Sequence, residues 1–209
     1  MYKKYFNKNT QRTNKQAGFT LVELLIATTV FSTILLLCTY GLIQVGNMMY
    51  KGRTSAHTQN MARSIIDDIS QAIQYGGRDL RTTVISADGS IIVGSEDTGA
   101  FCVGDKRYRY KINTIVGDGD SDWGLIVDSG LTACSYDSVP GAGAKELLAN
   151  NMSITKFSLT KSTNDNYTIN ITVAYGAADT RDASGNCKSG AGSQFCAVSK
   201  QSTIVRRRV

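Results

Sequence analysis

The sequence predicts an α+β protein in which one long N-terminal helix packs on an antiparallel β-sheet, and three patterns support this fold class. Residues 19–43 contain no Lys, Arg, Asp or Pro. Apolar residues then recur at every third or fourth position up to Tyr75, which is the period of an amphipathic helix. Residues 167–175 alternate between apolar and polar side chains, as a half-buried strand does.

We expect the helix to cover residues 19–76 and to be transmembrane over residues 19–43. A helix of these 25 residues is about 37 Å long, and roughly 20 residues suffice to cross a bilayer. Gly76 and Gly77 supply a stop, because glycine adopts the left-handed conformation without a Cβ clash. The second half carries an apolar stripe that a sheet must cover. Its members are Ala62, Ile65, Ile66, Ile69, Ala72 and Ile73.

Residues 77–209 are expected to form one β-rich globular domain, in which Gly- and Asp-containing turns separate short strands. The two most regular strands are 152–160 and 167–175, and the loop between them predicts an antiparallel hairpin. Shorter strands are expected at 82–87, 91–93, 108–112, 124–127 and 202–207.

Most of the formal net charge of +6 comes from the first 18 residues, which contain five bases and no acid. Without them the chain has 18 basic and 17 acidic residues. By the positive-inside rule, this distribution predicts a cytoplasmic N-terminus and an exocytoplasmic C-terminal domain. The charge is therefore a topology signal and does not by itself indicate nucleic-acid binding. The five bases are Lys3, Lys4, Lys8, Arg12 and Lys15.

One carboxylate, that of Glu23, interrupts the apolar segment. A lone acid in hydrocarbon costs on the order of a few kcal/mol, and acids in such positions are usually functional. We therefore expect Glu23 to meet a compensating charge.

The residues from Gly18 to Leu25, Gly-Phe-Thr-Leu-Val-Glu-Leu-Leu, resemble the processing signal of type IV pilins and pseudopilins. The resemblance implies that residues 1–18 are a leader, that prepilin peptidase cuts between Gly18 and Phe19, and that the new amino terminus of Phe19 is N-methylated. It also implies an assembly role for Glu23, whose carboxylate would neutralise the terminal ammonium of a neighbouring subunit. The alternative is a signal anchor that happens to contain a glutamate.

The resemblance implies a non-enzymatic structural subunit with a lollipop-like shape and no cofactor. Its implied partners are other pilin or pseudopilin subunits, prepilin peptidase and an inner-membrane assembly platform. The subunit would start as a single-pass protein of the inner membrane and end in a cell-surface filament. Length and the strand pattern after residue 147 resemble larger minor subunits of the PilW and pseudopilin J kind. The alternative function is a membrane-anchored adhesin or DNA-binding receptor that never polymerises.

Four cysteines lie outside the apolar segment, where Cys38 is the fifth. Four cysteines allow three pairings, and we favour Cys102 with Cys134 and Cys187 with Cys196. A zinc site is the rival interpretation, but the chain lacks a Cys-x-x-Cys motif and its only histidine is the distant His57. Disulfides fit an oxidising exterior.

Two further motifs suggest ligands. Asp118, Asp120 and Asp122 alternate in a way that lets a loop direct oxygen ligands towards calcium, although a solvated acidic turn explains the same pattern. Residues 106–111 interleave bases and aromatics, as nucleic-acid-binding surfaces do. Strand alternation also explains this pattern, and it predicts that Arg107, Arg109 and Lys111 face water while Tyr108, Tyr110 and Ile112 face the core.

Overall fold

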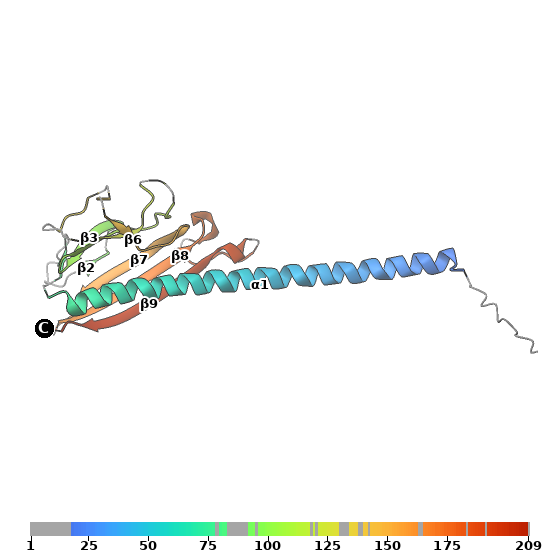
Figure 1. Ribbon diagram of the computed structural model, residues 1–209, viewed down its shortest axis with the longest axis horizontal. Coiled ribbons are helices and arrows are strands. Elements are labelled where there is room, and N and C mark those ends of the chain that lie inside the picture. Colours follow the sequence, from blue (N-terminus) through green and yellow to red (C-terminus); the bar gives the residue numbers. More distant parts are fainter. Residues whose placement is uncertain are drawn as a thin grey trace, which may run out of the picture. The chain divides into compact units, whose positions relative to one another are not determined.

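The protein has an α+β fold with one long helix and two antiparallel sheets (Figure 1). By its contacts the chain divides into two units, Met1–Val45 and Gly46–Val209. The computed structural model describes residues 18–77, 80–82, 92–94, 96–117, 119, 121–129, 134–137, 140–141, 143–162, 165–182, 184–190 and 192–208.

Helix α1, Leu21–Tyr75, has 55 residues and confirms the predicted helix. It ends beside the predicted glycine stop, and Gly77 has a φ of 62°, which a residue with a Cβ adopts only with strain. The stripe predicted from the sequence is buried, and it extends two turns further towards the N-terminus through threonines. The buried residues are Thr54, Thr58, Ala62, Ile65, Ile66, Ile69, Ala72 and Ile73.

The strands form a five-stranded sheet and a four-stranded sheet. The first has the order β1-β3-β4-β5-β6, with β1 at Arg81–Thr82, β3 at Thr98–Val103, β4 at Lys106–Lys111, β5 at Leu125–Ser129 and β6 at Lys145–Glu146. The second has the order β2-β7-β8-β9, with β2 at Ile92–Val93, β7 at Met152–Lys161, β8 at Asn166–Tyr175 and β9 at Ala197–Arg206. Two short 3-10 helices, η2 at Ala178–Thr180 and η3 at Ser193–Phe195, precede β9.

The predicted hairpin is confirmed as β7 and β8, which pair from Met152 with Tyr175 to Lys161 with Tyr167. β9 continues the sheet along β8, so the three long strands lie side by side (Figure 1). Two strands escaped prediction. β3 is buried on both faces and so shows no alternation, and β6 is only two residues long.

β6 is held by the carboxylate of Glu146 as well as by strand pairing. Its Oε1 accepts hydrogen bonds from the backbone N–H groups of Leu125, Leu147 and Leu148 at 3.0–3.1 Å, and its Oε2 accepts one from Gly124 at 2.9 Å. One side chain therefore satisfies four backbone donors where the short strand meets β5.

The core of the globular unit lies where both sheets meet the buried stripe of α1. Phe101 stacks on Tyr108 at 4.9 Å and on Phe157 at 5.6 Å between ring centroids, which joins the two sheets. The Tyr108 hydroxyl donates a 2.7 Å hydrogen bond to Asp68 on α1. Burial and this carboxylate raise the pKa of Tyr108, so the hydroxyl stays protonated and ties β4 to the helix.

The prediction that Arg107 and Arg109 face water is wrong. Their side chains are 8% and 0% exposed. Tyr108 and Tyr110 face the core as expected, and only Lys111 of the three bases remains partly exposed, with its Nζ 4.1 Å from the centre of the Trp123 ring. Strand alternation assigned the arginines correctly to the second face of the sheet, but that face is covered as well.

Residues 134–137 help to cover this second face and bring compensating groups to the arginines. Asp128 of β5 accepts from Arg107 at 3.1 Å and pairs with Arg109 at 2.8 Å. From the covering segment, the Asp137 carboxylate pairs with Arg107 at 2.7 Å, and the Asp137 carbonyl accepts from Arg109 at 2.6 Å. Buried charges persist only with such partners.

Disulfides join Cys102 to Cys134 and Cys187 to Cys196. These are the two pairings favoured from the sequence. The first attaches the covering segment 134–137 to β3, and the second closes the loop that contains η3. Each bond therefore fastens an irregular segment to a sheet.

We predict that Asp128→Asn lowers the free energy of unfolding by about 3–5 kcal/mol, because it leaves two buried guanidinium groups short of a charge. Urea titration followed by the fluorescence of Trp123, whose ring lies 5.6 Å from the Arg109 guanidinium, measures the change. Asp137→Ala is the matched control. Its carboxylate is 56% exposed, so its loss costs less than about 1 kcal/mol. Equal losses in the two variants would contradict this account of the cluster.

Candidate processing and assembly site

The predicted cleavage junction lies just before α1. Gly18 and Phe19 precede the first helical residue, and Phe19 is 88% exposed. A Cβ added to Gly18 would meet no atom within 4 Å. The bond between them is therefore in accessible, non-helical chain, which is the form in which a peptidase can bind backbone.

Thr20 and Glu23 form a reciprocal capping arrangement at the start of the helix. The Thr20 backbone N–H and hydroxyl donate to Glu23 Oε2 at 2.9 and 2.8 Å, and the Glu23 backbone N–H donates to Thr20 Oγ1 at 3.3 Å. Such a Thr-x-x-Glu box satisfies helix N–H groups that otherwise lack partners. The motif was readable in the sequence, but we had assigned Glu23 to assembly alone.

The cap uses only one of the two carboxylate oxygens of Glu23. Among the described residues, Oε1 accepts no hydrogen bond. The carboxylate also lies at the positive end of the helix dipole, which favours a negative charge there. The structure thus gives Glu23 partial local compensation and leaves one oxygen open to a further donor.

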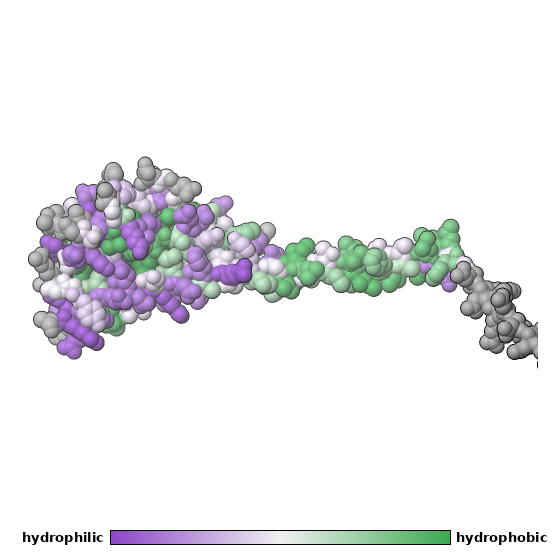
Figure 2. Space-filling model, in the orientation of Figure 1, coloured by the Kyte–Doolittle hydropathy of each residue, from purple (hydrophilic) through white to green (hydrophobic). Residues whose placement is uncertain are grey.

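The following helical segment is apolar and lacks cover within the chain. Among the described residues, α1 is the one helix long and apolar enough to cross a membrane, and its most apolar stretch is fully exposed. Figure 2 shows apolar residues over most of this part of the helix. Its hydroxyl side chains donate to backbone carbonyls three or four residues earlier, so they do not remain unsatisfied in hydrocarbon. These are Thr28, Thr29, Ser32, Thr33 and Thr39.

The calcium hypothesis cannot be placed on the structure, because Asp118 and Asp120 lie outside the described residues. Asp122 belongs to a tight turn in which its N–H donates to the Gly119 carbonyl at 2.9 Å and its own carbonyl accepts from Gly117 at 3.1 Å. Within the described part of the chain, no three His, Cys, Asp or Glu side chains gather as a metal site.

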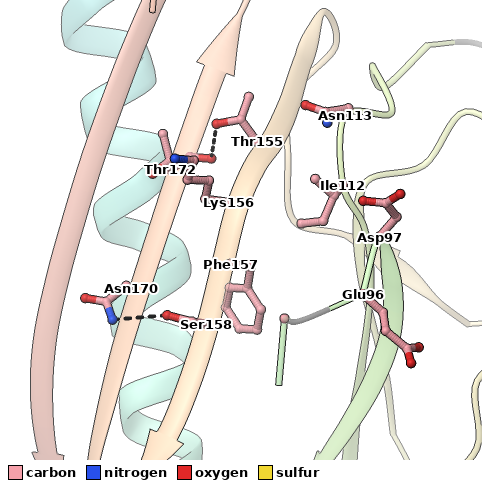
Figure 3. Close-up of a pocket in the computed structure, with 11 residues that line it drawn as sticks. Glu96, Asp97, Ile112, Asn113, Thr155, Lys156, Phe157, Ser158, Asn170 and Thr172 are labelled. Carbon is pink, nitrogen blue, oxygen red and sulfur yellow. Dashed lines mark hydrogen bonds between the residues drawn. The ribbon is translucent and has the colours of Figure 1, made fainter. Parts of the chain in front are cut away.

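An open pocket of about 490 Å³ lies beside β7 and β8 (Figure 3). Glu96 and Asp97 line it on one side, and polar side chains of the sheet line the other. Several of these are already paired: Asn170 donates to Ser158 at 3.1 Å, for example. None of its described lining residues is His or Cys, and His57 lies exposed on α1. The pocket therefore presents no nucleophile with an adjacent histidine base.

The basic strand does not present the surface that nucleic acid would need. Arg107 and Arg109 are buried in ion pairs, so their guanidinium groups are already occupied. This removes the strongest sequence-based reason for a nucleic-acid partner on β4.

Comparison with known families matches residues 13–39 to the prokaryotic N-terminal methylation motif. The matched range contains the predicted junction, the capping pair and the first half of the apolar segment. No curated protein and no solved structure matches the chain. The chain thus carries the N-terminal methylation signal typical of type IV pilins, at the start of an exposed apolar helix.

Proposed function

We propose that this protein is a structural subunit of a type IV pilus or of a pseudopilus like that of type II secretion. The observation that carries the proposal is the methylation motif at residues 13–39, which leads directly into an apolar helix that nothing in the chain covers. Such a surface is stable only in lipid or against the helices of other subunits.

Processing is the first step of the proposed function. Prepilin peptidase removes residues 1–18, and the amino group of Phe19 is then methylated. The exposed, non-helical chain at Gly18 and Phe19 supports this step. The apolar part of the mature helix, residues 19–43, then holds the subunit in the inner membrane, and residues 77–209 form the domain outside the cytoplasm. The two disulfides fit that oxidising location.

Assembly is the second step, and it depends on Glu23. In the mature chain the terminal ammonium of Phe19 is one residue from the capping pair, and an equivalent ammonium comes with every neighbouring subunit. The open Oε1 of Glu23 can accept from such a group, which would convert a costly isolated charge into an ion pair that sets the stagger between helices. The size of the globular unit fits a minor subunit of the PilW or pseudopilin J kind.

The processing step predicts a mature chain that begins at N-methyl-Phe19. Intact mass and N-terminal sequencing of the protein from membranes measure this. Gly18→Leu should leave the leader attached, because the added side chain occupies the space that the accessible junction keeps open. Gly41→Leu is the control, since that glycine lies within α1 and away from the junction. A wild-type chain that keeps its first residues in the membrane would contradict the proposal.

The assembly step predicts that Glu23→Ala loses filament incorporation by roughly tenfold or more, which corresponds to about 1.4 kcal/mol, while membrane insertion is retained. Immunoblots of sheared filaments and of membranes separate the two effects. Thr20→Ala breaks the capping pair but keeps the carboxylate, so it should assemble nearly as well as wild type. Equal defects in both variants would assign Glu23 to capping alone, and no defect in either would favour the non-polymerising receptor.

A further inference from the structure

An exposed aromatic pair lies at the end of the globular unit where the buried stripe of α1 begins. The rings of Tyr50 on α1 and Phe195 on η3 meet edge to face with centroids 5.0 Å apart. They are 42% and 49% exposed. Tyr50 also exchanges a hydrogen bond with the side chain of Tyr175. We call Tyr50 and Phe195 the aromatic pair.

The fold holds Phe195 in this exposed position. The next residue, Cys196, is buried and covalently bound to Cys187. The Phe195 carbonyl approaches Gly176 so closely that a Cβ there would lie 2.4 Å from the oxygen, and Gly176 has a φ of 101°. A large apolar ring on a covalently closed, closely packed loop cannot turn inwards to escape water. Its exposure is thus built into the structure.

The aromatic pair is close along the chain to the predicted membrane span. Tyr50 follows the last residue of that span, Ile43, by seven positions, and both belong to α1. Seven helical residues rise about 10 Å, which places Tyr50 near the headgroup layer that flanks the hydrocarbon core. The first helix residue buried by the globular unit, Thr54, comes one turn later. Tyr and Trp are enriched at this depth in membrane proteins.

The charges around the aromatic pair suit an anionic lipid surface. The chain has no Asp or Glu between Glu23 and Asp67, whereas Lys51 and Arg53 directly follow Tyr50 and are exposed. The disulfide loop itself contains Lys188 and no acid. The nearest acids before it in sequence are Asp179 and Asp182, and the Asp182 carboxylate accepts N–H groups of its own turn from Ser184 and Asn186.

We propose that Tyr50 and Phe195 form an interfacial anchor that inserts into the headgroup region of the outer leaflet of an anionic bilayer while the subunit is in the membrane. Lys51 and Arg53 bind the lipid phosphates beside it. The inference rests on the proposed insertion of residues 19–43 but not on polymerisation. It assigns the Cys187–Cys196 disulfide the task of keeping an apolar ring at the membrane surface.

The test uses the full mature chain in liposomes that contain phosphatidylglycerol and lipids brominated along their acyl chains. Three tryptophan variants are compared, and the emission of buried Trp123 is subtracted using the parent protein. Phe195→Trp is the test, Phe31→Trp reports insertion of the apolar segment, and Tyr75→Trp is the matched control on the same helix, 67% exposed at its far end. The bromolipid should quench Phe31→Trp and Phe195→Trp and blue-shift the latter, but leave Tyr75→Trp unchanged.

The three variants separate failure of this inference from failure of membrane insertion. Quenching of Phe31→Trp without quenching of Phe195→Trp overturns the anchor and leaves insertion intact. An unquenched Phe31→Trp overturns both. Quenching of Phe195→Trp should also fall when phosphatidylcholine replaces the anionic lipid or when Lys51 and Arg53 are both changed to Ser. Quenching that disappears on dilution of protein in lipid would instead assign the pair to a contact between copies and overturn the proposal.

Discussion

A single carboxylate in an apolar helix is the constraint on which the structure of the N-terminal unit depends. Glu23 must be compensated wherever the helix resides, because water is absent from both a bilayer core and a packed helical bundle. The chain supplies part of this compensation itself through Thr20. What remains is an oxygen directed to no described group, at the end of the helix where a processed amino terminus would lie.

The globular unit treats its charges differently. Arg107 and Arg109 share Asp128 and are covered by residues 134–137, which contribute Asp137. Each buried charge in this cluster therefore has its partner within the same chain, and a disulfide holds the covering segment in place. The contrast is informative: a protein able to close a buried cluster internally leaves the carboxylate of its apolar helix half satisfied, which fits a partner supplied by another subunit.

Most features governed by local periodicity could be predicted from the sequence. The buried stripe of α1, its glycine stop, the β7–β8 hairpin and both disulfide pairings fall in this group, as do Gly18, Phe19 and Glu23 within the matched motif. β3 escaped because a strand buried on both faces does not alternate. The burial of Arg107 and Arg109 escaped because it depends on a segment about thirty residues away along the chain, and alternation states only that a strand has two faces. The Thr20–Glu23 cap was local and readable, but the transmembrane role of Glu23 had drawn attention away from it.

The most direct measurement of the role of Glu23 is a solid-state NMR distance between subunits in a filament. Subunits of this chain carrying 13C-labelled glutamate would be assembled with neighbouring subunits that are 15N-labelled at their amino termini. If the carboxylate pairs with a neighbour, a 13C–15N dipolar contact should appear across the two labels, at the separation of an ion pair, within about 4 Å. A contact found only when both labels are in the same chain, or no contact at all, would contradict an intersubunit role for Glu23.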